Sequence, residues 1–134
     1  MTWKIALAAI GLVALGAVPS ASARSPMEPA ADKPARACFW TRSVNGFAAA
    51  DDRIVYLRVG VRDVYELQML GPCYDLDWAN AIGIRNRSGS GRVCTGLDAD
   101  IISPSLSGPQ RCPVRTVRKL TLTEAAALPK GSQP

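Results

Sequence analysis

Two segments near the middle of the chain alternate hydrophobic and polar side chains with a period of two. The hydrophobic set consists of Val55, Leu57 and Val59 in residues 54–59, and of Tyr65, Leu67 and Met69 in residues 64–69. Successive side chains of a strand point to opposite faces, so this pattern is typical of half-buried strands. The residues between the two segments, 60–63, suit the loop of a β-hairpin.

Shorter apolar runs predict further strands, with turn-forming residues between them. The further strands are expected at residues 38–42, 82–86, 92–94, 100–102 and 112–119. The turns are expected at Asn45-Gly46, Gly71-Pro72, residues 88–91 and residues 107–109. Several short strands at regular spacing indicate a mainly β fold, a small β-barrel or sandwich stapled by disulfides.

One or two short accessory helices are expected to interrupt the strands. Asp75 can cap a helical turn that runs to residue 81 and places Trp78 on the sheet. Thr121 and Glu124 have the spacing of a capping box, and residues 125–128 would continue that helix until the next proline.

The first 23 residues have the features of a secretory signal peptide. Lys4 supplies a positive charge, residues 5–18 form an unbroken apolar run, and Ala21-Ser22-Ala23 offers small residues for cleavage. A buried core helix is the alternative, but the run has no polar face, and it is shorter than the roughly 20 residues that span a bilayer. We therefore expect cleavage near Ala23, no transmembrane segment in the mature chain, and a periplasmic or secreted protein.

The remaining chain is expected to form one domain between two unstructured segments. Residues 24–36 contain three prolines and no apolar period, which is typical of a flexible spacer. Residues 37–128 hold all the predicted strands and helices, and residues 129–134 are expected to be a disordered tail. At 134 residues the chain is too short for two independent cores.

The cysteines are expected to form two structural disulfides. They are Cys38, Cys73, Cys94 and Cys112. Their spacing contains no C-x-x-C, which argues against zinc, iron–sulfur and thioredoxin-type sites, and an oxidising compartment favours disulfides. Three pairings are compatible with the sequence. We favour Cys38–Cys112 with Cys73–Cys94, because the first and last long strands commonly pair when a small sheet closes.

Composition limits the chemistry that the chain can perform. It contains no histidine, which excludes Ser/His/Asp and Cys/His catalytic units and histidine-ligated metals. Carboxylates are close in sequence at Asp51-Asp52, at Asp75 and Asp77, and at Asp98 and Asp100. Such groups could serve a calcium site or a glycosidase-type pair, but capping and turn formation account for them. We expect no catalytic residue, no cofactor and no metal ligand, with a carboxylate-based hydrolase as an alternative.

Positive charge exceeds negative charge, with 16 Lys and Arg against 11 Asp and Glu. Arg85, Arg87 and Arg92 flank the sequence Ser88-Gly89-Ser90-Gly91. If that loop is a hairpin tip, the three guanidinium groups converge there and can bind a phosphate or carboxylate. The alternative is a solvated loop whose arginines discourage association through strand edges and keep the protein soluble.

Seven aromatic residues follow the predicted signal peptide, and five of them could serve either the core or a binding face. Trp78 and Tyr65 are expected in the core. Trp40, Phe47 and Tyr74 lie beside predicted turns, where they either form a binding face or pack around a disulfide.

The order of several short motifs resembles a family known as a domain of unknown function, made up of small exported proteobacterial proteins. The residues that carry the resemblance are Cys38, Asp51-Asp52, Cys73 and Leu76 in CYDL, Cys94 and Asp98 in CTGLD, Arg111-Cys112-Pro113-Val114, and Leu120-Thr121 with Glu124. The resemblance implies export and a compact cysteine-containing domain, and it implies no activity.

These features predict an exported, non-enzymatic binding module of the bacterial envelope. The arginine-flanked loop would contact an anionic ligand such as a lipopolysaccharide phosphate, an anionic glycan or an acidic protein surface. The alternative is an inhibitor or regulator of a periplasmic enzyme that acts through protein–protein contact. Nucleic acid is not an expected partner, because no aromatic residue interleaves the basic ones.

Overall fold

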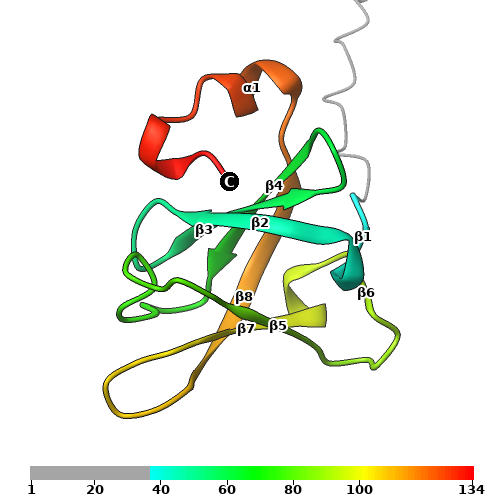
Figure 1. Cartoon of the computed structure of the whole chain (residues 1–134). Helices are drawn as coiled ribbons and strands as arrows, with labels where there is room; N and C mark the ends of the chain where they lie inside the picture. The colour runs from blue at the N-terminus through cyan, green and yellow to red at the C-terminus, as the bar shows by residue number, and fades with distance from the viewer. Residues whose placement is uncertain (1–36) are drawn as a thin grey trace, which may run out of the picture. The chain divides into compact units, whose positions relative to one another are not determined.

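The computed structural model describes residues 37–134 of the chain. The predicted signal peptide, its cleavage site and the predicted spacer lie outside the described residues. Within residues 37–134 most of the regular structure is β-strand, and the mainly β fold that the sequence predicts is confirmed (Figure 1). None of the helices in this part of the chain has the length and apolar character needed to cross a membrane.

Six strands form one antiparallel sheet that curls into a half-barrel (Figure 1). In spatial order they are β2 (Val44–Ala49), β3 (Ile54–Val59), β4 (Asp63–Met69), β8 (Gln110–Lys119), β7 (Ala99–Ser103) and β5 (Gly83–Asn86). The long strand β8 pairs with β7 through its first half and with β4 through its second half. The sheet therefore bends at β8 and leaves β2 and β5 as its two edges. Two short strands, β1 (Phe39–Trp40) and β6 (Arg92–Val93), pair with each other separately.

The core lies on the face that the alternating pattern predicts. Leu57 of β3 is opposite Tyr65 of β4, and Val55 is opposite Leu67. All four side chains are buried, and the ring of Phe39 packs 4.9 Å from the ring of Tyr65, centroid to centroid. Full burial of a large apolar side chain is worth about 1.5–3 kcal/mol, so this β3–β4 hairpin is a main source of stability.

The sequence pattern does not predict β2, and the predicted turn at Asn45-Gly46 is wrong. These residues lie inside β2 at a β-bulge, where the pairing with β3 shifts register between Val44 and Gly46. The side-chain amide of Asn45 donates a hydrogen bond to the carbonyl of Gly60 (2.6 Å). A Cβ on Gly46 would lie 3.1 Å from Nη2 of Arg58. The Asn-Gly pair therefore forms a β-bulge here and not a turn. Both structures need a backbone that can leave the regular strand conformation, so the same residue types suit both.

The predicted helix at residues 75–81 is also wrong. The segment consists of irregular turns, and Trp78, expected in the core, is 80% exposed. Asp75 adopts a left-handed conformation with φ 59°, which is incompatible with a right-handed α-helix at this position. The side-chain amide of Gln110 donates to the carbonyl of Tyr74, and Leu76 rather than Trp78 is the side chain of this loop that is buried in the core.

All four cysteines form disulfides, as predicted, but the favoured pairing is wrong. Cys38 is bonded to Cys94, and Cys73 is bonded to Cys112. The reason is strand order: β1 pairs with β6, so Cys38 and Cys94 flank the paired residues Phe39 and Val93. The last long strand, β8, pairs with β4 and β7 and not with β1, and Cys112 lies in its first half, which pairs with β7.

The C-terminal capping box is confirmed. Thr121 Oγ1 accepts a hydrogen bond from the Glu124 N–H (3.2 Å), and Glu124 accepts one from the Thr121 N–H (2.8 Å). They open α1 (Leu122–Ala126). The tail, expected to be disordered, instead contains a 3₁₀ turn, η3 (Lys130–Ser132), that contacts β2. Two further 3₁₀ turns are η1 (Thr41–Ser43) and η2 (Gly96–Asp98).

Candidate functional site

Three arginines surround one buried carboxylate on the outer face of β5, β7 and β8. Asp100 of β7 lies directly opposite Arg85 of β5, and opposite residues of neighbouring strands share a face. On its other side Asp100 pairs with Pro113 of β8, so Arg111, two residues earlier, projects from the same face. Arg87 follows β5 at the same periodicity. We call Arg85, Arg87, Arg111 and Asp100 the basic face.

Asp100 holds Arg87 in place and lies at ion-pair distance from Arg111. Its side chain is 3% exposed, and its Oδ1 accepts hydrogen bonds from Nε of Arg87 (3.0 Å) and from Nη2 of the same guanidinium. Nε of Arg111 lies 4.0 Å from Oδ2. The hydrogen bond to Asp100 raises the pKa of Arg87 above its ordinary value. The basic face therefore carries three positive charges against one negative charge.

Arg85 differs from its neighbours in having no acidic partner. It is exposed, and it makes no ion pair within residues 37–134. Its guanidinium is the one most available to a ligand, while Arg87 is hydrogen-bonded to Asp100 and Arg111 lies 4.0 Å from it. Planar guanidinium groups match phosphate and carboxylate oxygens in pairs, so the arrangement is suited to either anion.

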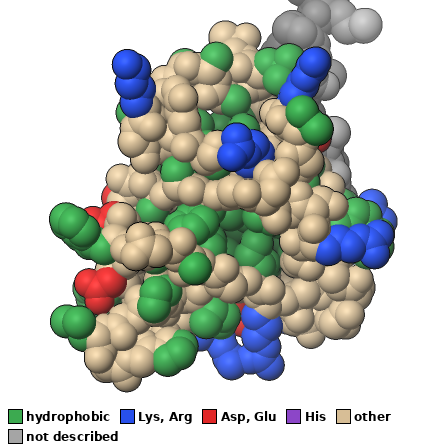
Figure 2. Space-filling model, in the orientation of Figure 1, with side chains coloured by type: hydrophobic (Ala, Val, Ile, Leu, Met, Phe, Trp, Pro, Cys, Tyr) green, Lys and Arg blue, Asp and Glu red, His purple; other side chains and the backbone are tan. Residues whose placement is uncertain are grey.

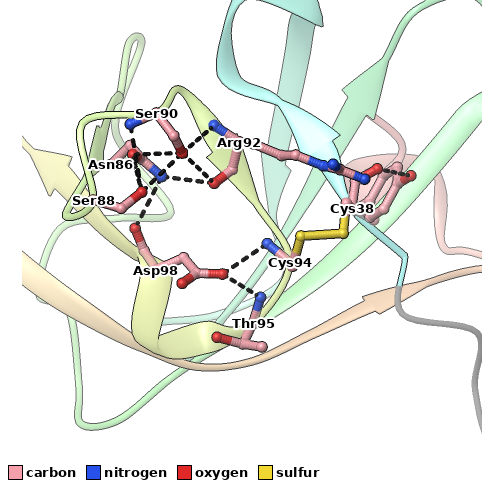
Figure 3. The surroundings of a disulfide bond; sticks show 9 residues. Cys38, Asn86, Ser88, Ser90, Arg92, Cys94, Thr95 and Asp98 are labelled. Carbon is pink, nitrogen blue, oxygen red and sulfur yellow. Dashed lines mark hydrogen bonds between the residues drawn. A yellow bond between two sulfur atoms is a disulfide. The ribbon is translucent and has the colours of Figure 1, made fainter.

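The Ser88–Gly91 loop is closed by hydrogen bonds to Asn86 (Figure 3). The side-chain oxygen of Asn86 accepts from Ser88 Oγ (2.8 Å) and from the Gly91 N–H (3.2 Å). Its side-chain nitrogen donates to the carbonyls of Arg92 (2.8 Å) and Asp98 (3.3 Å). The polar groups of this loop thus bond to one another, which leaves fewer of them for a ligand than the sequence suggests.

Arg92 does not join the other two predicted arginines. Its side chain extends from β6 away from the loop and toward Cys38 (Figure 3). There it lines a groove of about 820 Å³ together with Arg118, Lys119 and Glu124. Of the three candidates, the structure brings Arg85 and Arg87 together on one sheet face and places Arg92 elsewhere.

Sequence reasoning missed Asp100 as an anchor and Arg111 as a neighbour. The signal for Arg111 was the alternation along β8, in which it precedes the buried Cys112 and so faces outward. No local pattern indicates Asp100, because its partner Arg87 is 13 residues away in the sequence.

The remaining acidic residues have structural partners or lie at the surface. Asp51 accepts hydrogen bonds from the Arg53 and Ile54 N–H groups (2.7 and 2.8 Å) in the β2–β3 turn. Asp98 accepts from the Cys94 and Thr95 N–H groups (2.9 and 2.8 Å), and these bonds lower the pKa of its carboxyl group. Asp52, Asp75 and Asp77 lie in loops. Within residues 37–134, no three Cys, Asp or Glu side chains gather closely enough to hold a metal ion.

The three aromatic residues proposed as a binding face occupy different elements. Trp40 is 43% exposed in β1, with the guanidinium of Arg42 4.9 Å from its ring centre. Phe47 of β2 packs against the core, and Tyr74 is 66% exposed in the loop after β4. These three residues therefore form neither one binding face nor a common cluster around one disulfide.

A groove of about 550 Å³ opens between the two edges of the sheet. Its apolar floor consists of Val44 and Phe47 of β2 and of Ile82 and Ile84 in and beside β5. Figure 2 shows hydrophobic side chains at the bottom of the hollow between these strands. We call it the β2–β5 groove.

Comparison with known proteins places the chain in a family. No curated protein and no solved structure matches it. A family profile matches residues 1–133, a span that includes both disulfides, the basic face and the β2–β5 groove. The chain therefore belongs to the family described as a family of unknown function (DUF6491).

Proposed function

We propose that the chain is an exported, non-enzymatic binding module of the bacterial envelope whose basic face holds an anionic group. The observation that carries this proposal is the placement of Arg85, Arg87 and Arg111 around the single buried carboxylate of Asp100. The ligand class is a phosphate or carboxylate displayed by an envelope component, such as a lipopolysaccharide phosphate or an acidic glycan.

The charge balance supports an anionic ligand. Asp100 neutralises part of the charge on Arg87 and Arg111, and its hydrogen bonds hold the Arg87 side chain near the sheet. Arg87 therefore loses little side-chain entropy when a ligand binds, and Arg85 adds a charge without an acidic partner. Because these guanidinium groups are at least partly exposed, the affinity should fall steeply as salt increases.

Export to the periplasm is part of the same proposal. Cleavage near Ala23 would release the chain after Lys4 and the apolar run at residues 5–18 direct its secretion. Two disulfides support an oxidising compartment, since thiols are kept reduced in the cytosol.

The experiment measures binding of the mature chain to vesicles that carry lipopolysaccharide, with neutral phosphatidylcholine vesicles as the reference. The double variant Arg85→Ala/Arg111→Ala should bind about tenfold more weakly, because it loses two charge-assisted contacts. Its salt dependence should also become shallower.

Two controls separate the basic face from general charge. Arg53→Ala/Arg62→Ala removes the same charge from turns at the β2–β3–β4 side of the sheet, and it should bind like the unaltered chain. Arg92→Ala tests the loop site that the sequence alone suggests, and it should also have no effect. Equal loss in all three variants would refute a specific site, and full binding by Arg85→Ala/Arg111→Ala would refute the basic face.

A second candidate function is the inhibition or regulation of a periplasmic enzyme by direct protein–protein contact. The observation that favours it is the β2–β5 groove, which exposes half-buried apolar side chains at the edges of the sheet. A complex formed there should survive high salt, because its contacts would be largely apolar. Binding that vanishes at high salt would instead favour the anionic ligand.

A further inference from the structure

The two edges of the half-barrel line the same opening. β2 and β5 are the first and last strands of the six-stranded order, and both contribute to the β2–β5 groove (Figure 1). An edge strand carries a row of unpaired backbone N–H and C=O groups, which can pair with a further strand.

The backbone of β2 directs free hydrogen-bonding groups into the opening. The Ala50 N–H donates to the Ile54 carbonyl (2.9 Å), so the next pair along, Ala48 with Tyr56, is also hydrogen-bonded. Hydrogen-bonded and non-hydrogen-bonded pairs alternate in an antiparallel ladder. The N–H and C=O groups of Phe47 and Ala49 therefore point away from β3, toward the free edge.

On the opposite side of the opening, β5 also directs free backbone groups away from its neighbour. The Arg87 N–H donates to the Asp98 carbonyl (2.8 Å), so Arg85 with Asp100 is also a hydrogen-bonded pair. The backbone groups of Ile84 then point away from β7. Among residues 37–134 no third strand pairs with the free edge of either β2 or β5.

The floor of the groove is apolar and only half covered. Val44, Phe47, Ile82 and Ile84 are each partly buried and pack against the core. A strand added beside β2 would place alternate side chains over this floor, because the side-chain period of a strand is two.

The charge at the groove favours an acidic occupant. Arg42 lines it and is the one Lys or Arg among the described side chains there. No carboxylate is among the described side chains that line it.

We propose that the β2–β5 groove binds an extended, acid-flanked peptide segment of a partner protein, which adds to β2 as a strand and packs alternate apolar side chains against Ile82 and Ile84. β2 is the primary edge because it is the longer of the two, with 6 residues against 4 in β5. Main-chain hydrogen bonds would supply affinity, and the apolar floor would select the side chains. This inference deepens the second candidate function and is independent of the basic face.

The test uses amide hydrogen exchange of the mature chain, followed by NMR, with and without a synthetic probe peptide. The probe alternates valine and threonine between terminal glutamates, and a lysine-flanked version is the charge control. At millimolar glutamate peptide, exchange at the Phe47 and Ala49 amides should slow at least about tenfold. The Ala48 amide, which already pairs with β3, should not change and is the internal control.

Two variants sharpen the result. Ala49→Pro removes one outward N–H without touching the β3 ladder, and proline is tolerated where an edge N–H faces outward. It should bind the peptide about five- to tenfold more weakly, whereas Ala48→Ser on the same strand should bind normally. Arg42→Glu should reverse the preference between the glutamate and lysine peptides.

Several outcomes would overturn the inference. No slowing at Phe47 and Ala49, or slowing that Ala49→Pro leaves intact, excludes strand addition to β2. Slowing that appears without peptide as the protein concentration rises would identify a second copy of the chain as the occupant. Because Arg85→Ala/Arg111→Ala should bind the peptide normally, and Ala49→Pro should bind lipopolysaccharide normally, the two proposals fail separately.

Discussion

Arg87 donates two guanidinium hydrogen bonds to a single oxygen of Asp100, a carboxylate that is 3% exposed and belongs to the neighbouring strand. The pair joins the end of β5 to β7 across the outer face of the sheet. It is a structural contact, since it satisfies a buried charge, and it also positions a guanidinium at a surface that we propose binds anions. Stability and binding can therefore be separated by comparing Arg87 with Arg85.

Arg87→Ala should lower the free energy of unfolding by about 1–3 kcal/mol, because it leaves the Asp100 carboxylate buried without its main partner. Urea denaturation measures the change. The double variant Arg87→Ala/Asp100→Asn should regain part of the loss, since the buried charge is then absent. Arg85→Ala, which breaks no ion pair, should stay within about 0.5 kcal/mol of the unaltered chain. Equal effects of Arg87→Ala and Arg85→Ala would contradict the anchoring role of Asp100.

Mass mapping of the unreduced chain should recover Cys38 linked to Cys94 and Cys73 linked to Cys112, with no free thiol. Replacing both cysteines of either pair with serine should cost about 4 kcal/mol in the chain-entropy description, since the pairs are 56 and 39 residues apart. Thermal unfolding of the two double variants checks this. A peptide linking Cys38 to Cys112 would contradict the strand pairing of β1 with β6.

Acid should destabilise the fold partly through Asp98. Hydrogen bonds from the Cys94 and Thr95 N–H groups hold the pKa of Asp98 below its ordinary value of 3.8. A carboxyl group whose pKa is lower in the folded state contributes stability above its unfolded pKa and loses it as the pH falls through the folded pKa. Stability should therefore decline below about pH 4.

The variant Asp98→Asn isolates that contribution. It should be less stable than the unaltered chain near neutral pH, and its urea midpoint should change less on acidification. Asp77→Asn, at an exposed position in the loop after β4, is the control and should keep the full acid dependence. An Asp98→Asn variant with the same acid dependence as the unaltered chain would rule out this role.

Gly96→Ala should cost about 3 kcal/mol or more, or prevent folding. Gly96 is buried in η2, and an added Cβ would overlap the backbone carbonyl of Arg115 in β8, which cannot move without disturbing the ladder with β4. Gly71→Ala is the matched control, because a Cβ there meets nothing within 4 Å, and its stability should change by well under 1 kcal/mol. Circular dichroism melts of both variants provide the comparison.

The sequence determined those parts of the protein that depend on neighbouring residues. The alternation around Leu57 and Leu67 predicted β3 and β4 with their buried faces, since a strand's side-chain period is a local property. The spacing of Thr121 and Glu124 predicted the start of α1, because a capping box closes within one helical turn.

Only the tertiary structure decided what depends on distant segments. The cysteine pairing follows from the contact of β1 with β6, and the basic face follows from β5 and β8 lying on either side of β7. For the same reason the sequence places Arg85 and Arg87 near each other, but only the structure adds Arg111 to their face and separates Arg92 from it. Local patterns specify which face of a strand is buried. Which strands become neighbours depends on how the whole chain buries those faces together, and no short stretch of sequence carries that information.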